Sequence, residues 1–218
     1  MPSINKDIKT GKGTLMYITI TGEGRNGAMK GQPERMQYMA SVVFKKDSPE
    51  HKELEAQIKE VWAEYSKANG VKGAPKSLGI KPVMKETDEL DEYGAKIKVP
   101  TDEVIATFKT DVKWKDGNAK IIDVFQPSGK KCTEAIQKAD WKIGNGTLGK
   151  IYGVASANDV GGTHKVSLYL SAVQLAGNLV KYTGSTVQAE AMDDVEDMEF
   201  DEDLNDVSAS NESERPNI

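Results

Sequence analysis

Stretches rich in β-branched and aromatic residues, interrupted by a single helical pattern, constrain the fold of this chain more than any other sequence feature. Two of them, 14–20 and 36–44, precede the helical pattern, and four follow it, 104–114, 119–125, 146–157 and 164–175. The segments between them contain the Gly, Pro, Asn and Asp residues that are typical of hairpins and turns. Because strands and helices do not alternate, the order argues against a doubly wound sheet and favours a small, mainly antiparallel barrel.

The helical pattern lies in residues 48–70 and carries its own start and stop signals. Apolar side chains recur at helical spacing at Leu54, Ile58, Val61, Trp62 and Tyr65. Ser48 is a favourable N-cap, Pro49 suits the first helical position, and Gly70 suits the end. These signals predict one amphipathic helix. The mixed Lys, Gly, Pro and acidic composition of residues 71–100 predicts a long loop or lid after it.

Charge is divided unevenly along the chain. Residues 189–218 hold 12 Asp and Glu residues and one basic residue, Arg215, whereas residues 1–188 hold 22 acidic and 28 basic residues, a net charge of +6. The C-terminal segment also has few large apolar residues, so it cannot bury enough surface to offset the entropy of ordering. We therefore predict one folded domain over residues 1–184 and a disordered acidic tail over residues 185–218.

The sequence offers little material for covalent or metal chemistry. Its single cysteine, Cys132, excludes an internal disulfide, and two histidines, His51 and His164, are too few for a zinc cluster. Neither histidine has a recognisable spacing to a nucleophile, so we predict no catalytic residue, no metal and no cofactor. The absence of a signal peptide and of a run of about 18 apolar residues predicts a soluble cytoplasmic protein that does not enter a membrane.

Two short motifs match functional patterns only in part. Gly22, Gly24 and Gly27 have the spacing of a dinucleotide-binding loop, but a Pro-containing loop and a strand follow them instead of a helix, which favours a flexible loop. The five carboxylates within residues 86–92 are of the ligand type that a metal-dependent nuclease or a calcium site needs. The calcium-loop spacing is absent, which favours a solvated loop.

Aromatic and basic side chains lie on one face of several predicted strands. Lys109 alternates with buried-type residues such as Phe108, and Tyr169 occupies a position where a polar residue is expected. Single-stranded nucleic acid needs both features, because bases stack on aromatic rings while cations follow the phosphates. The candidate DNA-binding residues are Arg35, Tyr38, Lys109, Lys113, Trp114, Lys150, Tyr152, Lys165 and Tyr169.

The order of these segments resembles the OB-fold single-stranded-DNA-binding proteins of tailed bacteriophages. The resemblance covers the helix that begins SPEHKEL, the hairpin FKTDVKWKDGNAKIIDVF followed by SGKK, the closing pair of strands and the acidic tail. It implies a five-stranded antiparallel OB barrel with one inserted helix, and it places Lys109, Lys113, Lys150 and Tyr152 in the DNA-binding groove. The tails of several relatives end in an aromatic residue, whereas the aromatic residue of this tail, Phe200, is internal.

The resemblance implies sequence-tolerant, non-catalytic binding of single-stranded DNA in phage replication or recombination, in the host cytoplasm. The acidic tail is then expected to regulate binding and to recruit replication or recombination proteins. Two alternatives come from other classes: a metal-dependent nuclease that uses the carboxylates of residues 86–92, and an acidic-tailed scaffold or chaperone for basic proteins. The sequence leaves open the choice between DNA and RNA, the site size and the formation of a homo-oligomer.

Overall fold

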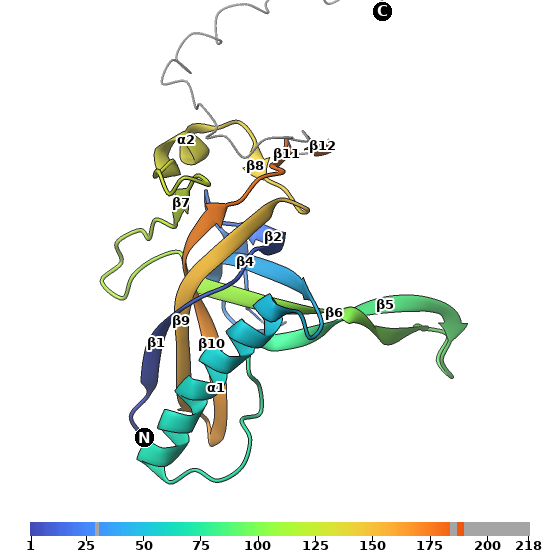
Figure 1. Ribbon diagram of the computed structural model, residues 1–218, viewed down its shortest axis with the longest axis vertical. Coiled ribbons are helices and arrows are strands. Elements are labelled where there is room, and N and C mark those ends of the chain that lie inside the picture. Colours follow the sequence, from blue (N-terminus) through green and yellow to red (C-terminus); the bar gives the residue numbers. More distant parts are fainter. Residues whose placement is uncertain (29–30, 184–186, 190–218) are drawn as a thin grey trace, which may run out of the picture.

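The computed structural model describes residues 1–28, 31–183 and 187–189. Within them, the elements in chain order are β1 (Ile4–Lys9), β2 (Gly13–Thr19), β3 (Arg25–Asn26), β4 (Met36–Lys45), α1 (Pro49–Asn69), β5 (Ile80–Leu90), β6 (Lys96–Asp111), β7 (Asp123–Phe125), α2 (Thr133–Lys138), β8 (Lys142–Ile143), β9 (Leu148–Val160), β10 (Thr163–Leu175), β11 (Val180–Tyr182) and β12 (Val187–Ala189). The chain is therefore mainly β (Figure 1). The predicted acidic tail lies outside the described residues from position 190 onward.

Five strands form the predicted antiparallel barrel. Their order is β6-β4-β2-β9-β10, and each neighbouring pair is antiparallel. The first and last strands of this order, β6 and β10, also pack against each other, which closes the sheet. The apolar side chains of these strands that point inward, including Leu15, Val42, Phe108, Ile151 and Val173, are fully buried and form the core.

The predicted helix is confirmed as α1, with the predicted start and end. The Ser48 side chain accepts a hydrogen bond from the His51 backbone N–H at 3.3 Å, and Gly70 ends the helix in the left-handed conformation at φ 66°. Its apolar stripe is buried, and the helix packs against β1, β9 and β10. No helix in the described part of the chain, α1 included, is long and apolar enough to span a membrane.

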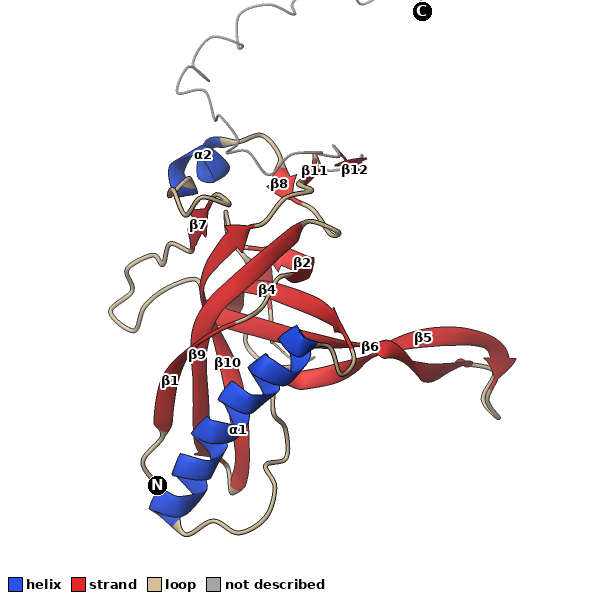
Figure 2. Cartoon of the chain, viewed as in Figure 1, coloured by secondary structure: helices blue, strands red, loops and turns tan. Residues whose placement is uncertain are grey.

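The prediction of a loop for residues 71–100 holds for residues 71–79 and was wrong for residues 80–100. Strand β5 and the first part of β6 form a long hairpin that projects from the barrel (Figure 2). We call residues 80–103 the arm. Both faces of the arm carry exposed side chains, with pairs such as Glu86 opposite Lys98 and Met84 opposite Pro100. Since neither face is buried against the barrel, apolar and polar residues alternate only briefly, at residues 96–99, which is too short a run to reveal both strands.

A lobe at one end of the barrel also differs from the prediction. The strand expected over 119–125 shortens to β7, which pairs in parallel with β10, and the short helix α2 follows it. Strands β8, β11 and β12 form a separate small sheet. Because β12 spans Val187–Ala189 and pairs with β11, backbone pairing continues beyond residue 184, the predicted end of the folded domain. The domain boundary itself remains a prediction.

Candidate nucleic-acid interface

The outward face of β4 and β6 gathers polar and basic side chains. The antiparallel register places Gln37 opposite Asp111 and Met39 opposite Lys109. Residues that directly oppose each other point to the same side of a sheet, and their chain neighbours point to the other. Phe108, the neighbour of Lys109, is accordingly fully buried while Lys109 is exposed. We call this face the β4–β6 face.

The loop between β2 and β4 folds over one end of the β4–β6 face. Strand β3 pairs with β4, with Arg25 opposite Gln37. The Asn26 side-chain oxygen accepts hydrogen bonds from the backbone N–H groups of Ala28 at 2.9 Å and Arg35 at 3.2 Å, which fixes the loop. A Cβ at Gly27 would lie 2.2 Å from Oε1 of Gln37, so a larger residue there would displace the Gln37 side chain, which also donates to Asp111.

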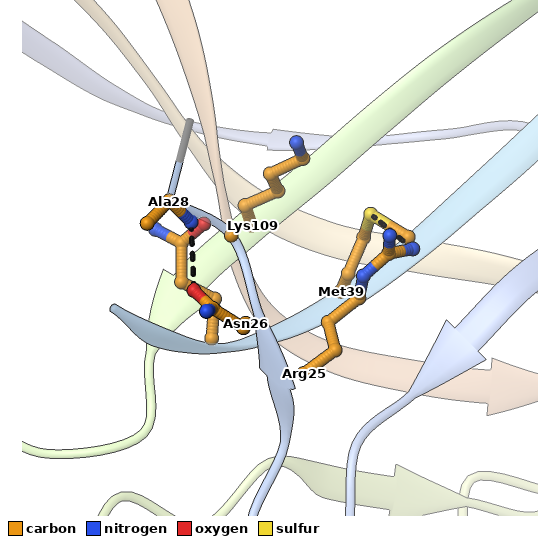
Figure 3. Close-up of a pocket in the computed structure, with 7 residues that line it drawn as sticks. Arg25, Asn26, Ala28, Met39 and Lys109 are labelled. Atoms are coloured by element: carbon orange, nitrogen blue, oxygen red, sulfur yellow. Dashed lines mark hydrogen bonds between the residues drawn. The ribbon is translucent and has the colours of Figure 1, made fainter. Parts of the chain in front are cut away.

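A hollow of about 190 Å³ lies between this loop and the β4–β6 face (Figure 3). Its lining comprises Arg25, Asn26, Gly27, Ala28, Gln37, Met39 and Lys109. Arg25 lies alongside Met39, with its Nη1 4.0 Å from the sulfur, and Lys109 enters from β6. Within the described residues, neither Arg25 nor Lys109 forms an ion pair with a carboxylate. The hollow thus presents two cations that are available to an anion.

Arg35, a predicted DNA-binding residue, is instead engaged by Asp111 beside the hollow. Its Nε and Nη2 donate to the two carboxylate oxygens of Asp111 at 2.8 and 3.0 Å, and Gln37 Nε2 donates to the same carboxylate at 3.0 Å. The hydrogen bonds from Arg35 have the largest effect on the pKa of Asp111. Together with the bond from Gln37, they hold this pKa below its usual value. The hydrogen bond to Asp111 raises the pKa of Arg35, and the Tyr169 phenol is near enough to contribute.

Trp114 offers the most exposed aromatic surface among the predicted DNA-binding residues. Its side chain is 59% exposed in the turn that follows β6, where Lys113 is exposed as well. Lys120 Nζ lies 4.3 Å from the centroid of the Trp114 ring and donates to Thr110 Oγ1 at 2.7 Å. The cation holds one side of the indole in place, and the remaining ring surface is accessible to a base.

The predicted residues of β9 and β10 form a second strip beside the β4–β6 face. Tyr169 is 41% exposed, whereas Lys150, Tyr152 and Lys165 are half-buried. The Tyr152 hydroxyl donates to Gln174 Oε1 at 2.7 Å, so its ring is held in a network with the neighbouring strand. Tyr169 is therefore the better placed of the two tyrosines for stacking on a base.

Tyr38 requires a correction. It is only 8% exposed, its ring belongs to the core cluster, and its hydroxyl donates to the Gly22 carbonyl at 3.0 Å. The prediction used only its proximity to Arg35 in sequence, because apolar residues on both faces of the stretch 36–44 leave no alternation that would show which side chains point outward. We do not propose a stacking role for Tyr38.

Sequence reasoning did not find the residues that line the hollow together with Lys109. Arg25 and Asn26 belong to the glycine-rich motif that was interpreted only as a flexible loop, and Gln37 and Met39 lie in a strand whose outward face the sequence does not identify. The signal that was available is the Arg between Gly24 and Gly27, since a cation in a loop that crosses a strand face is a candidate phosphate ligand.

The other candidate chemical groups lie apart from the hollow or are buried. The carboxylates of residues 86–92 lie on the outer part of the arm, where Glu86 pairs with Lys98 at 3.4 Å. In the described part of the chain, no three His, Cys, Asp or Glu side chains come together as metal ligands would. Burial raises the pKa of the Cys132 thiol to about 11, so this thiol is not ionised at neutral pH.

Comparison with known proteins supports the barrel at the level of the fold. No protein-family model and no curated protein matches the sequence. The crystal structure of gp2.5, a single-stranded DNA-binding protein encoded by bacteriophage T7, matches with a TM-score of 0.50 and 16% identity, over 78% of this chain and 86% of that chain. This chain has the gp2.5 fold.

Two structures of the single-stranded DNA-binding protein from bacteriophage Enc34 are also similar to this chain. The C-terminally truncated form matches with a TM-score of 0.48 and 16% identity, over 78% of this chain and 84% of that chain. The complex with single-stranded DNA matches with a TM-score of 0.48 and 14% identity, over 78% of this chain and 85% of that chain. The prediction of a phage-type OB barrel, made from sequence resemblance, is confirmed by the gp2.5 match as a statement about the fold.

The ion pair at the edge of the hollow makes a testable prediction. Replacing Arg35 by Gln removes the main cause of the lowered pKa of Asp111, so we expect this pKa to rise toward the usual value. Because the folded-state pKa of Asp111 is lowered, the pair stabilises the fold at neutral pH, and this contribution disappears as the pH falls through that pKa. Carboxyl NMR titration and unfolding at several pH values measure both effects. The Lys150→Gln variant leaves the pair intact, so it should keep both the wild-type pKa of Asp111 and the wild-type dependence of stability on pH.

Proposed function

We propose that this chain binds single-stranded DNA on the β4–β6 face, in a sequence-tolerant manner and without catalysis. The observation that carries the proposal is the pair of cations, Arg25 and Lys109, that face one hollow without a carboxylate partner in the described residues. An anion there displaces no existing ion pair. The strand face and flanking loops of OB barrels are a common site for oligonucleotides, which supports the same location.

The neighbouring side chains supply the second requirement, surfaces on which bases stack. Trp114 lies beyond one end of β6, and Tyr169 lies near Arg35 on the adjoining strand β10. A strand whose phosphates contact Arg25 and Lys109 would have to pass the end of β6 to reach Trp114, and cross toward β10 to reach Tyr169. Stacking uses the π-face that every base possesses, and the phosphates are the same in every nucleotide, so this arrangement favours binding without sequence preference.

The comparison with gp2.5 supports this choice of ligand, since that protein is a single-stranded DNA-binding protein with the same fold. By analogy we propose that this chain acts in phage DNA replication or recombination, in the cytoplasm of the host. The net charge of −11 in residues 189–218 supports a regulatory tail that competes with DNA for the basic face and contacts basic surfaces of partner proteins.

The salt dependence of binding tests the location of the phosphate contacts. We expect Arg25→Gln and Lys109→Gln each to weaken binding of a single-stranded oligonucleotide and to lower the slope of log K against log salt by about 0.7, the value for one phosphate contact. Fluorescence titrations at several salt concentrations measure the slope. Lys67→Gln, which makes the same charge change on α1, is the matched control. Equal slopes for all three variants would mean that net charge alone governs binding and would contradict the proposed site.

The stacking role of Trp114 has its own test. We expect Trp114→Ala to weaken oligonucleotide binding by about 1 to 3 kcal/mol, the usual contribution of one base on one ring. The loss of fold stability should be small, because the side chain is largely exposed. Affinity and thermal unfolding are measured on the same preparation, with Trp114→Phe as a variant that retains an aromatic ring. Wild-type affinity in the alanine variant would remove Trp114 from the interface.

Truncation after Ala189 tests the proposed competition by the tail. Removing 12 carboxylates deletes a tethered anion whose effective concentration is about millimolar for a short flexible linker. We expect single-stranded DNA to bind modestly tighter and duplex DNA to gain by a larger factor, since duplex competes through charge without exposed bases. A full-length chain in which the tail carboxylates are replaced by amides should behave like the truncated chain. Unchanged affinities at low salt in both variants would exclude contact between the tail and the basic face.

A further inference from the structure

The arm holds more of the large exposed apolar residues than any other described element. Its large exposed apolar residues are Met84, Leu90, Tyr93, Ile97 and Val99. The register places Met84 and Leu90 on one face and Ile97 and Val99 on the other, and an isolated two-stranded hairpin of this kind is only marginally stable in water. The arm therefore has the properties of an element that is covered by another molecule.

The tip of the arm combines apolar and acidic groups in an ordered turn. Residues 86–95 contain five carboxylates and no basic residue. Asp91 Oδ1 accepts hydrogen bonds from the backbone N–H groups of Tyr93 and Ala95, both at 2.9 Å. This turn holds Tyr93 outward, where its side chain is 86% exposed. A surface that receives the tip must be apolar and carry positive charge at its edge.

A pocket with these properties lies at the base of the arm. It has a volume of about 460 Å³, within the range of about 300 to 1,000 Å³ that is typical of ligand pockets. Its apolar lining is Leu78, Ile80, Pro82, Pro100 and Val104. Lys46 and Lys81 line it as well, and residues of the first turns of α1, His51 and Glu55, complete it. The nearby N-terminus of α1 adds to the positive potential.

The negative charge in the pocket is already compensated. Glu55 is the single carboxylate in the lining, and it forms an ion pair with Lys59 one turn further along α1, at 3.0 Å. Lys46 and Lys81 form no ion pair within the described residues. The pocket thus presents an apolar floor with two unpaired ammonium groups to an incoming acidic, apolar tip.

The tip cannot enter the pocket of its own chain. Pro82, at the pocket, and Leu90, near the tip, are eight residues apart on β5, roughly 26 Å along a strand. The backbone pairing of β5 with β6 keeps the arm extended over this length. A second copy of the chain removes the difficulty, because two arms that lie antiparallel bring each tip to the base of the other arm.

We propose that this chain forms a two-fold symmetric dimer in which the arms lie antiparallel and each tip occupies the pocket at the base of the partner's arm. Such an interface is isologous, since tip contacts pocket and pocket contacts tip, and it closes after two copies. It covers the exposed apolar residues of both arms and pairs the tip carboxylates with the partner's lysines. This inference concerns assembly and is independent of the proposed binding of DNA.

Sedimentation of the full chain over about 1 to 100 micromolar tests the dimer. We expect a concentration-dependent dimer for the wild type and at least a tenfold weaker one for the double variant Leu90→Ser, Tyr93→Ser. Ile121→Ser, which removes an equally exposed apolar side chain outside the arm, should dimerise like the wild type. A wild type that remains monomeric at every concentration overturns the proposal.

Charge reversal then tests the contact between tip and pocket. We expect Lys46→Glu with Lys81→Glu, and separately Glu89→Lys with Glu92→Lys, each to weaken the dimer at least tenfold, and a mixture of the two variants to associate again. Asp91 is left unchanged because its side chain holds the turn. Glu86 is left unchanged because it pairs with Lys98. Thermal unfolding of each variant checks that the fold is retained. A dimer that is unaffected by either reversal, or a folded mixture that does not associate, contradicts the docking of tip in pocket.

Discussion

At Gly153 in β9 the barrel leaves no space for a side chain. A Cβ at this position would lie 2.2 Å from the carbonyl oxygen of Tyr169 in β10 and 2.8 Å from the ring of Phe108 in β6. The missing side chain therefore lets β6 approach the β9–β10 pair closely enough for Phe108 to be fully buried. Closure of the barrel depends on this crossing, because β6 and β10 are the two ends of the five-strand order.

The same crossing determines which side chains face outward at the candidate site. Once Phe108 points into the core, Lys109 must point to the opposite side of β6. The register with β4 then brings Lys109 opposite Met39, which contributes to the hollow. Close packing of β6 on β10 also brings Tyr169 near Arg35. The basic and aromatic groups on this side of the barrel thus follow from one buried aromatic contact.

How much could be predicted depended on whether a segment buries one face. Helix α1 was predicted to the residue at its start because Ser48, Pro49 and a buried apolar stripe all indicate the same element. Lys109 was placed correctly because its strand alternates cleanly between buried and exposed positions. The arm was missed because it buries neither face against the barrel. Tyr38 was misassigned because nearly every residue of β4 is buried, so alternation does not identify the outward face.

The hollow could not be predicted, since it depends on contacts between segments distant in sequence. Arg25 reaches Met39 only because β3 pairs with β4, and the loop fits there because Gly27 passes close to Gln37. A pattern of neighbouring residues in the sequence shows neither the pairing of β3 with β4 nor the approach of Gly27 to Gln37. The sequence contained the cations, but the tertiary structure decided which of them carry a carboxylate partner.

That distinction determines where an anion binds most readily. Arg35 has the bidentate geometry that suits a phosphate, yet the Asp111 carboxylate already occupies it, and the lowered pKa of Asp111 reflects this interaction. A phosphate at Arg35 must therefore compete with an existing ion pair and lies close to a negative charge. Arg25 and Lys109 form no ion pair within the described residues, so a phosphate there competes with no carboxylate. In the proposed function, the Asp111 carboxylate limits the positive potential at the end of β6 and favours the hollow over Arg35 as the site of a phosphate.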